Sequence, residues 1–522
     1  MRRFRMSKKV VWMLSFEYEG VVKAGGLGAA VARYCRALAA RGFSATVLIP
    51  SHGVRRQQRV ESGWSGERRG VDGNTYPYSV GAETYIVDGV RVVSFRGLDQ
   101  PTSRFLDSPE VYREPAEKAS LYTRAVMHWA AEQPRLPDVV HSNDWTTALA
   151  GMALKMFSSE RGAATPWVHT IHLLSSPSFP WHYASEQWSG LRSVLHRVVS
   201  AHGVYTTWVS DAWDSVGGNV DAFAALESDV LVSVSHGYAE GVVSRLGFVP
   251  REKVCVVYNS TDWELSRVDS WVRSVYGTGS RSALRPLVLR SLLAGLKSAE
   301  GSLDGCSLLV VSHGRLVWQK GFDTLLNALE HADPQVGVLI LGLSSGDTAH
   351  EEYLKHLTQR YFGRAVVARE PVSPQLLQAV VYVANAAAVP SRYEPFGISS
   401  IEAQALGTPV VVSNVPGLSE TVKNMEVDER GTALLVNPDD PRNLGQALTS
   451  VAWLTEAVDA NQPALAGRAP LESVRRRFDR LRDVRMNAAS WVDENFRERN
   501  TGEMLLHCYA KALQAALLRQ SK

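Results

Sequence analysis

Short apolar strands alternate with helical stretches twice along this chain, and that alternation limits its fold most strongly. The first occurrence runs through "KKVVWMLSF" (8–16), "GGLGAAVARYCRALAARG" (25–42) and "FSATVLIP" (43–50). Apolar residues recur at helical spacing in the middle segment, and Gly42 closes it. A strand, a helix and a second strand in that order predict a parallel pair of strands, so the chain is expected to be an α/β protein.

The pattern continues to about residue 260. "TYIVDGVRVVSF" (84–95) predicts a hairpin that turns at Asp88-Gly89. Four further strand-like runs alternate with helical stretches: "PDVVHS" (137–142), "PWVHTIH" (166–172), "DVLVSVS" (229–235) and "KVCVVYN" (253–259). The first part of the chain is therefore expected to be one doubly wound, Rossmann-like domain.

A second series of short buried strands begins near residue 306. Its members are "CSLLVVSHG" (306–314), "GVLILG" (337–342), "RAVVAR" (364–369), "AAAVPS" (386–391), "TPVVVSN" (408–414) and "ALLVNP" (433–438). The predicted division is a first domain over 1–262, a helical connection over 263–305, a second Rossmann-like domain over 306–484 and a helical tail over 485–522. Ligands of such sheets bind beyond the carboxyl ends of the strands, so two facing edges would form one deep cleft.

Composition narrows the function classes. The 522 residues are 45% hydrophobic with a formal net charge of only +3, which favours neither nucleic acid nor an anionic membrane as a partner. The four cysteines include no C-x-x-C, so neither a zinc site nor a disulfide framework is indicated. The basic start is followed by a short apolar run that meets Glu17 directly, which we interpret as a first strand and not a signal peptide. No window is apolar enough to span a membrane, and we expect a cytoplasmic protein.

Two glutamates flank a predicted helix start in "SRYEPFGISSIEAQALGTP" (391–409). Pro395 suits the start of a helix, and the backbone N–H groups of Gly397 and Ile398 would then be free to bind phosphate. Glu394 lies before that start and Glu402 lies further along the helix. A sugar linked through a diphosphate to a nucleoside would offer hydroxyls to both carboxylates. The alternative is that both glutamates are surface charges, because such a spacing is common.

Two cations and a glycine loop add to this pattern. Arg315 and Lys320 in "HGRLVWQKGFDTLL" (313–326) lie between a buried strand and a helix, where they would hold a diphosphate leaving group. Lys23, Gly25 and Gly26 lie on the first strand-to-helix loop, "VKAGGLGAA" (22–30), where a backbone can approach phosphate closely. The alternative for this loop is a plain tight turn. No D-x-D occurs, so leaving-group charge would be met by these cations and by helix ends, with no metal and no other cofactor.

Four segments together resemble one family. "KAGGLG" (23–28), "HSNDWTTALAG" (141–151), "SHGRLVWQKGFDTLL" (312–326) and "SRYEPFGISSIEA" (391–403) are similar to the signature segments of glycogen and starch synthases, which are retaining glycosyltransferases of the GT-B fold. Their order matches as well, and Glu394 and Glu402 match the family's E-x7-E pair. "IPSHG" (49–53) and "HTIHLLSSPSFPWHY" (169–183) resemble the archaeal branch most.

The resemblance implies a role for each site residue. Lys23 would contact the donor phosphates, and Arg315 and Lys320 would bind the pyrophosphate. Glu394 would bind sugar hydroxyls, and Glu402 would bind the ribose. The remaining implied roles are an acceptor-side contact for Asp144, a place at the reacting sugar for His172 through its ring and its carbonyl, and backbone N–H donors at Gly397 and Ile398.

The implied activity is transfer of glucose from ADP- or UDP-glucose to an α-1,4-glucan or maltooligosaccharide, with retention of configuration. The segment 369–374, "REPVSP", lacks an aromatic residue where some bacterial members stack the base, which leaves both donors open. The alternatives are a related transferase with a small-sugar or lipid acceptor and a catalytically silent glucan-binding protein. Five aromatic residues would form a glucan platform, pack in the core or make a contact in a homo-oligomer: Trp181, Tyr183, Trp188, Trp208 and Trp213.

Overall fold

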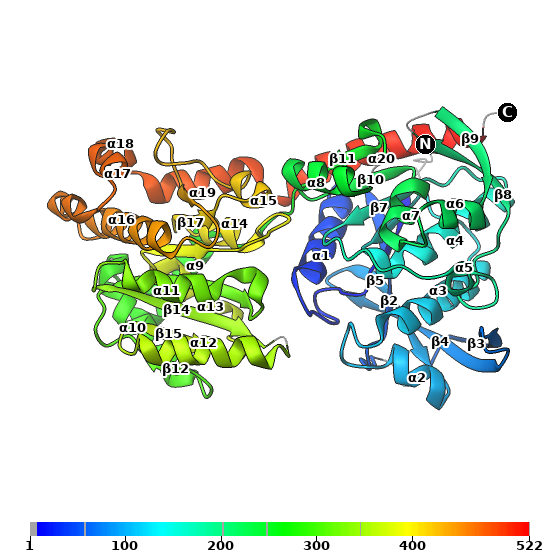
Figure 1. The fold of residues 1–522 in the computed structure, drawn as a ribbon, viewed down its shortest axis with the longest axis horizontal. Coiled ribbons are helices and arrows are strands. Elements are labelled where there is room, and N and C mark those ends of the chain that lie inside the picture. Colours follow the sequence, from blue (N-terminus) through cyan, green and yellow to red (C-terminus); the bar gives the residue numbers. More distant parts are fainter. Residues whose placement is uncertain (1–7, 57–58, 201–202, 247–248, 345, 521–522) are drawn as a thin grey trace, which may run out of the picture. The chain divides into compact units, whose positions relative to one another are not determined.

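The chain forms two compact units (Figure 1). The computed structural model describes residues 8–56, 59–200, 203–246, 249–344 and 346–520. Residues 1–259 and 498–522 make up the first unit, and residues 260–497 make up the second. The chain therefore passes from the first unit to the second and back again.

The first unit is built on one large sheet. Within the described ranges it has nine strands in the order β11-β10-β7-β6-β1-β2-β5-β4-β3. The strands are β1 (Lys9–Leu14), β2 (Phe43–Pro50), β3 (Ser62–Arg69), β4 (Thr75–Val87), β5 (Val90–Gly97), β6 (Val139–Asn143), β7 (Trp167–Ile171), β10 (Val230–Ser233) and β11 (Val254–Val256). All neighbouring pairs from β11 to β5 are parallel, whereas β4 runs antiparallel to both of its neighbours.

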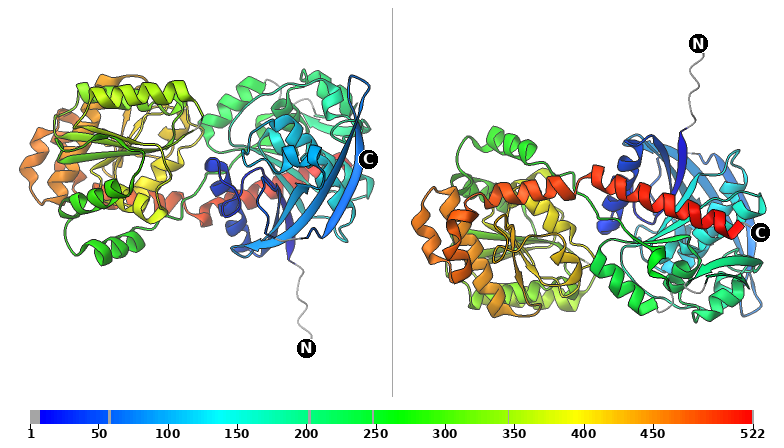
Figure 2. Two further views of the ribbon diagram at one scale, coloured as in Figure 1. Left: turned by 90° about the horizontal axis from the view of Figure 1, so that it is seen from below. Right: turned by 90° about the horizontal axis from the view of Figure 1, so that it is seen from above.

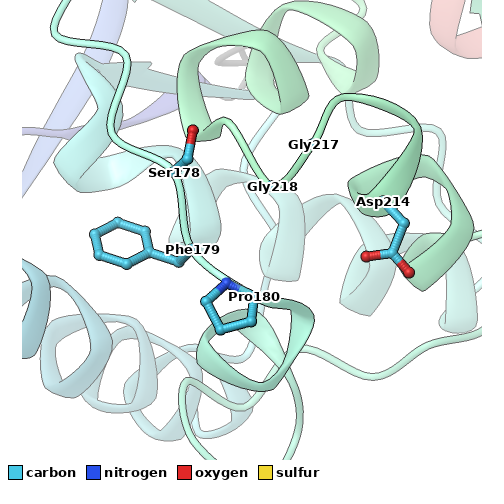
Figure 3. Close-up of a pocket in the computed structure, with 6 residues that line it drawn as sticks. All are labelled: Ser178, Phe179, Pro180, Asp214, Gly217 and Gly218. Atoms are coloured by element: carbon cyan, nitrogen blue, oxygen red, sulfur yellow. The ribbon is translucent and has the colours of Figure 1, made fainter.

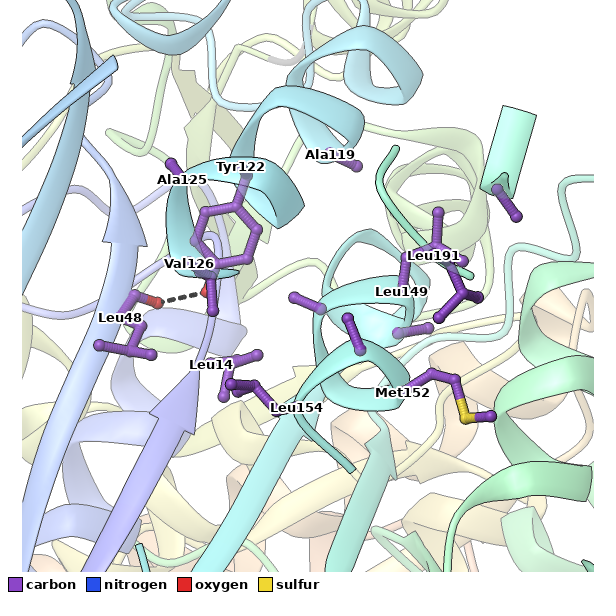
Figure 4. Packing of buried hydrophobic residues seen from close by; sticks show 14 of the residues in the cluster. Leu14, Leu48, Ala119, Tyr122, Ala125, Val126, Leu149, Met152, Leu154 and Leu191 are labelled. Atoms are coloured by element: carbon purple, nitrogen blue, oxygen red, sulfur yellow. Dashed lines mark hydrogen bonds between the residues drawn. The ribbon is translucent and has the colours of Figure 1, made fainter. Parts of the chain in front are cut away.

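Helices cover both faces of this sheet. The helices of the first unit are α1 (Gly26–Ala39), α2 (Gln100–Leu106), α3 (Pro115–Ala131), α4 (Ala148–Glu160), α5 (Trp181–Ala184), α6 (Val209–Ser215), α7 (Val220–Glu227), α8 (His236–Leu246) and α20 (Glu498–Gln520). α1 and α20 lie side by side, as Figure 2 shows, and pack with alternate strand residues in one core. α3, α4 and α7 form the other core, where the Tyr122 hydroxyl donates to the Leu48 carbonyl at 2.8 Å (Figure 4).

The predicted hairpin turn at Asp88-Gly89 is confirmed. Val87 pairs with Val90 across a two-residue turn, and φ is 48° at Asp88 and 79° at Gly89. Two positive φ values in a row match a turn whose twist suits the flanking antiparallel strands. A second hairpin, β8 (Leu195–Ser200) with β9 (Gly203–Trp208), was not predicted and forms a separate two-stranded sheet.

The second unit repeats the doubly wound plan. Its sheet has seven strands in the part of the chain that the structure describes, in the order β12-β15-β14-β13-β16-β17-β18. They are β12 (Glu300–Ser302), β13 (Leu308–Arg315), β14 (Val336–Leu343), β15 (Ala365–Ala368), β16 (Ala386–Val389), β17 (Val410–Ser413) and β18 (Ala433–Val436). The six strands predicted from sequence are parallel, and only β12 runs antiparallel to its neighbour.

Helices enclose this second sheet as well. They are α9 (Leu265–Tyr276), α10 (Arg281–Gly295), α11 (Phe322–Asn327), α12 (Thr348–Arg360), α13 (Pro374–Val383), α14 (Ile398–Ala405), α15 (Pro416–Ser419), α16 (Pro441–Asp459), α17 (Glu472–Arg476), α18 (Phe478–Leu481) and α19 (Val484–Asn495). The core combines sheet residues with α11, α12 and α16. The prediction of two Rossmann-like α/β domains is therefore confirmed.

The unit boundaries differ from the predicted ones at the two connecting regions. Residues 263–305, expected to be a separate helical connection, belong to the second unit, because α9 and α10 pack on α13 and β12 pairs with β15. The expected helical tail, 485–522, is divided. α19 packs on α14 in the second unit, whereas α20 packs on α1 in the first.

Candidate active site

The candidate residues of the second unit lie where its sheet reverses direction. β13 is the central strand, with β14 on one side and β16 on the other. Connections leave the carboxyl ends of β13 and β16 in opposite directions, which opens a crevice suited to ligands in this class of sheet. Arg315 is the last residue of β13, and Glu394 follows the end of β16 by five residues.

Lys320 and Glu394 form an ion pair at this edge. Lys320 Nζ lies 2.5 Å from Glu394 Oε2, and the Ser391 hydroxyl donates to the same oxygen at 3.1 Å. Gly321 allows the two loops to meet. Its φ is 64°, and a Cβ there would lie 2.1 Å from the Pro390 carbonyl oxygen. A larger residue would therefore push the Lys320 loop away from Glu394.

Arg392 fixes the loop that carries Glu394. Its guanidinium donates to both carboxylate oxygens of Asp323 at 2.9 and 2.8 Å and lies 4.4 Å from the centre of the Trp318 ring. The planar fork of arginine suits such a two-bond contact. This contact positions residues 391–394 on the start of α11 before any ligand binds.

Arg315 and the start of α14 are left for a ligand. Among the described residues, the Arg315 side chain has no hydrogen bond or ion pair. α14 begins at Ile398 after Gly397, which has a φ of 102° and leaves the helix without a side-chain cap. A Cβ on Gly397 would lie 2.3 Å from a Leu418 methyl carbon, so this turn requires glycine. One cation and the N–H groups of a helix start thus form an anion-binding arrangement.

Glu402 lies further along α14, beside His313. Its Oε2 is 3.8 Å from His313 Nε2. The His313 side chain is 14% exposed and the Glu402 side chain is 13% exposed. Trp263 stacks on the His313 ring with centroids 5.9 Å apart. Glu402 therefore lies next to the His313 ring, which stacks with Trp263.

The first unit also carries its candidate residues at a reversal point. β1 lies between β2 and β6, so the loop after β1 and the loop after β6 lead away in opposite directions. The glycine loop follows β1, Asp144 follows β6, and His172 follows β7. Because these strands are parallel, the three segments lie at the same edge of the sheet.

The His172 ring is neutral and its tautomer is set by Asn143. The Asn143 amide nitrogen donates to the Leu14 carbonyl at 2.9 Å, so its oxygen faces His172 Nε2 at 3.0 Å. Nε2 therefore carries the ring proton, and Nδ1 remains a hydrogen-bond acceptor. Burial lowers the pKa of His172 to about 3, so the ring stays uncharged at ordinary pH.

Asp144 supports the backbone that follows β7. Its Oδ1 accepts the N–H groups of His172 at 2.7 Å and Leu173 at 3.2 Å. φ at Asp144 is 58°, a left-handed value that is uncommon for a residue other than glycine. Burial raises the pKa of the Asp144 carboxyl to about 8, although the two N–H donors act in the opposite direction.

Two further side chains hold the same loop. The Tyr238 hydroxyl accepts the N–H of Leu174 at 2.6 Å, and Asp221 Oδ2 accepts those of Ser175 at 3.1 Å and Ser176 at 2.6 Å. Together with Asp144, these contacts bind five successive backbone N–H groups. The loop that carries His172 is therefore fixed from three different elements.

The glycine loop is already occupied by a carboxylate of the chain itself. Glu17 Oε2 accepts the N–H groups of Ala24 at 2.8 Å and Gly25 at 2.7 Å, and Glu17 Oε1 accepts the Tyr112 hydroxyl at 2.6 Å. The N–H of Gly25, which sequence suggested for a phosphate, is thus engaged in this structure. Gly26 begins α1, and Lys23 pairs with Glu19 at 3.0 Å on the surface.

The five aromatic residues in 181–213 do not form one platform. Trp213 and Tyr183 are buried in the core, Trp181 and Trp188 are partly buried against it, and Trp208 is exposed on β9. A pocket of about 400 Å³ lies nearby and is lined by Ser178, Phe179, Pro180, Asp214, Gly217 and Gly218 (Figure 3). Core packing thus accounts for two of the five residues.

Several supporting residues were not identified from the sequence. They are Glu17, Asn143, Asp221, Tyr238 and His313. Glu17 ends the first apolar run and Asn143 precedes Asp144, so their positions beside predicted strand ends were the available signal. Nothing local marks Asp221 or Tyr238, because they reach the His172 loop only through the tertiary fold.

Within the described ranges, no group of three or more His, Cys, Asp or Glu side chains is arranged to hold a metal ion. Among those same residues, no helix is both long and apolar enough to cross a membrane.

The two doubly wound units form the GT-B fold, and solved structures share this fold. The catalytic domain of starch synthase IV from Arabidopsis thaliana bound to ADP and acarbose superposes with a TM-score of 0.67 at 19% identity, covering 97% of this chain and 99% of that one. Sucrose-phosphate synthase from Thermosynechococcus elongatus gives a TM-score of 0.60 at 19% identity, covering 97% and 100%.

Sequence comparison identifies the family. Residues 10–249 match the starch synthase catalytic domain, and residues 297–457 match the glycosyl transferases group 1 domain. The glycogen synthase of Mycobacterium tuberculosis is 26% identical over 466 residues, covering 89% of this chain and 90% of the relative. The glycogen synthase of Koribacter versatilis is 26% identical over 440 residues, covering 78% and 84%. The chain belongs to the glycogen and starch synthase family of glycosyltransferases.

Proposed function

We propose that this protein is a glycogen synthase that transfers glucose from ADP- or UDP-glucose to the non-reducing end of an α-1,4-glucan, with retention of configuration. The observation that carries the proposal is the Lys320–Glu394 pair at 2.5 Å, beside an unpaired Arg315 and an uncapped helix start. This arrangement offers cations and N–H groups for a diphosphate next to a carboxylate for sugar hydroxyls.

In this proposal the second unit binds the donor. Arg315 and Lys320 neutralise the charge that develops on the departing nucleoside diphosphate, and the N–H groups of Gly397 and Ile398 bind its phosphate oxygens. Glu394 accepts hydroxyls of the transferred glucose. Glu402, the second carboxylate, accepts the ribose hydroxyls. The ion pair orients Lys320 and Glu394 before the donor arrives, so little reorganisation is needed.

The first unit supplies the residues at the reacting sugar. Nδ1 of the neutral His172 ring accepts the sugar 6-hydroxyl, and the His172 carbonyl faces the anomeric carbon. Asp144 acts as a positioning residue, because it holds the N–H groups of His172 and Leu173 and so fixes that carbonyl. Lys23 and Gly26 contribute to donor phosphate binding. Both sets of residues reach one donor if the two units close over it, which excludes water.

One assay tests the proposal directly. Purified protein is incubated with ADP-glucose or UDP-glucose and with glycogen, maltooligosaccharide or glucose, and early product is examined by proton NMR. We expect chain extension through α-linkages with at least one of the two donors, and unchanged rates in excess EDTA, because arginine, lysine and helix N–H groups carry the charge stabilisation. If glucose is transferred only to a small sugar or a lipid, the acceptor is not a glucan. A β-linked product would refute retention of configuration.

A further inference from the structure

The start of α7 forms a scaffold for the loop that carries His172. This loop, residues 172–179, follows β7, and three of its backbone groups bond to the residues that begin α7. The bonds join the Phe179 N–H to the Gly218 carbonyl at 3.0 Å (Figure 3), the Val220 N–H to the Pro177 carbonyl at 2.9 Å and the Asn219 side-chain nitrogen to the Ser176 carbonyl at 3.3 Å. The loop and the helix start are therefore built as one unit.

Asp221 completes this scaffold with a buried carboxylate. It is the second residue of α7 and is fully buried, and its Oδ2 accepts the N–H groups of Ser175 at 3.1 Å and Ser176 at 2.6 Å. Among the described residues, Oδ1 has no hydrogen-bond partner and no cation pairs with this carboxylate. A buried carboxylate without a counter-ion is costly, so the two bonds to the loop and the positive end of the helix are what offset that cost.

The two bonds from the loop to Asp221 are charge-assisted. Burial raises the pKa of the Asp221 carboxyl to about 6, although the N–H groups of Ser176 and Ser175 act in the opposite direction. The carboxyl is therefore mostly ionised at neutral pH. Hydrogen bonds to an ionised acceptor are about twice as strong as those between neutral groups.

The orientation of the His172 carbonyl depends on how the following residues are held. This carbonyl and the Leu173 N–H belong to one planar peptide unit, so they turn together. Asp144 holds that N–H at 3.2 Å, the longer of its two bonds to the loop. Ser176, three residues further on, has a φ of 51°, a left-handed value that serine adopts only where its surroundings impose it. Asp221 binds the N–H of this strained residue.

We propose that Asp221 is a positioning residue, which fixes the His172 carbonyl by binding the N–H groups of Ser175 and Ser176. This inference rests on the proposed function, because that function places the His172 carbonyl at the anomeric carbon. Asp221 acts only through the loop. Its loss should therefore misplace a group needed in the transition state and leave donor binding, which is assigned to other residues, nearly unchanged.

Kinetics of the full-length protein test this role. The variants are Asp221→Ala and Asp221→Asn, and Asp211→Ala is the matched control, because Asp211 is exposed on the neighbouring helix α6. With ADP-glucose or UDP-glucose and glycogen, we expect Asp221→Ala to lower kcat roughly tenfold to a hundredfold, with a donor KM within about threefold of the wild type. Asp221→Asn keeps an acceptor oxygen without the charge, so it should lose only about threefold to tenfold. The control should match the wild type.

Hydrogen exchange measured by mass spectrometry tests the loop without any substrate. In Asp221→Ala, peptides that cover 172–179 should exchange faster, whereas peptides of β6 and α4 should keep wild-type protection. Asp221→Asn should lie between the two. Because no donor is needed, this measurement decides whether Asp221 fixes the loop even if neither nucleotide sugar is a substrate, a result that would instead refute the proposed function.

Several outcomes would overturn the proposal. They are wild-type turnover in a folded Asp221→Ala protein, a rise in donor KM without a fall in kcat, and exchange that increases equally throughout the first unit. If Asp221→Ala does not fold, Asp221→Asn decides. Wild-type turnover together with wild-type exchange in that variant would show that the carboxylate is not needed to position the loop.

Discussion

The two units carry their candidate residues at equivalent places in similar sheets, yet these residues differ in how many of their polar groups already have partners. In the first unit, His172, Asp144 and Glu17 are engaged by neighbouring groups of the same unit, and the His172 ring is neutral. In the second unit, Arg315 has no partner among the described residues and α14 lacks a side-chain cap. The first site is thus a polar frame in which these groups bond one another, whereas the second presents positive groups that have no partner among the described residues.

This difference is the basis for our proposal of which charge each unit binds. A buried frame whose groups bond one another holds a backbone in place and has little capacity left for an ionic ligand. A free guanidinium beside a helix start favours a diphosphate instead. Substitutions in both units test whether the second unit governs the chemistry and the first unit the positioning.

Glu394→Gln should have the largest effect. It keeps the shape of the side chain but removes the negative charge beside a sugar that gains positive character in the transition state. We expect turnover to fall roughly a hundredfold to a thousandfold, as for the loss of one preorganised stabiliser. Steady-state kinetics with saturating donor measure this, and circular dichroism melts verify folding. A folded, fully active variant would reduce Glu394 to a surface charge.

Arg315→Gln should lower activity without lowering stability. A hydrogen bond to a charged group is worth about 1.5–3 kcal/mol, so we expect kcat/KM to fall about tenfold to a hundredfold. Arg392→Gln is the matched control, because Arg392 holds the partly buried Asp323 in a two-bond contact. That control should lower the melting temperature, whereas Arg315→Gln should not. Equal losses of stability in both variants would contradict a ligand-binding role for Arg315.

Glu402→Gln should act on binding more than on turnover. If Glu402 holds only the ribose, its contact is equally strong in the ground state and the transition state. We therefore expect the donor KM to rise about tenfold or less while kcat changes little. Donor titrations of Glu402→Gln and Glu394→Gln, measured side by side, separate the two roles. Equal losses of turnover would mean that the division between sugar and ribose is wrong.

Asp144→Asn tests the frame of the first unit through its pH dependence. The pKa of Asp144 is raised to about 8, so between the unfolded value near 4 and pH 8 the folded protein keeps a proton that the unfolded chain releases. Wild-type stability should therefore fall, relative to the variant, as the pH rises through that range. Asparagine keeps an oxygen that accepts the N–H groups of His172 and Leu173. Melting curves at several pH values measure the effect, and a constant difference would contradict it.

The sequence by itself determined the two doubly wound halves, and it placed the candidate residues in the segments that follow strands, with Glu402 on the helix of such a segment. Buried parallel strands are short, apolar and separated by helices, so all six predicted strands of the second unit could be located. The two-residue turn at Asp88-Gly89 was equally evident, because its backbone requires positive φ. The Lys320 and Glu394 segments were identified as charged loops, although no local signal showed that the two side chains pair.

Only the tertiary structure decided which groups are satisfied and which are left for a ligand. Glu17 accepts the N–H of Gly25 within the loop that follows β1, and Asn143 at the end of β6 sets the tautomer of His172 after β7. The return of α20 to the first unit is likewise a matter of packing, because its apolar residues fit the face beside α1. Such contacts depend on distance in space, which periodicity and spacing along a chain do not encode.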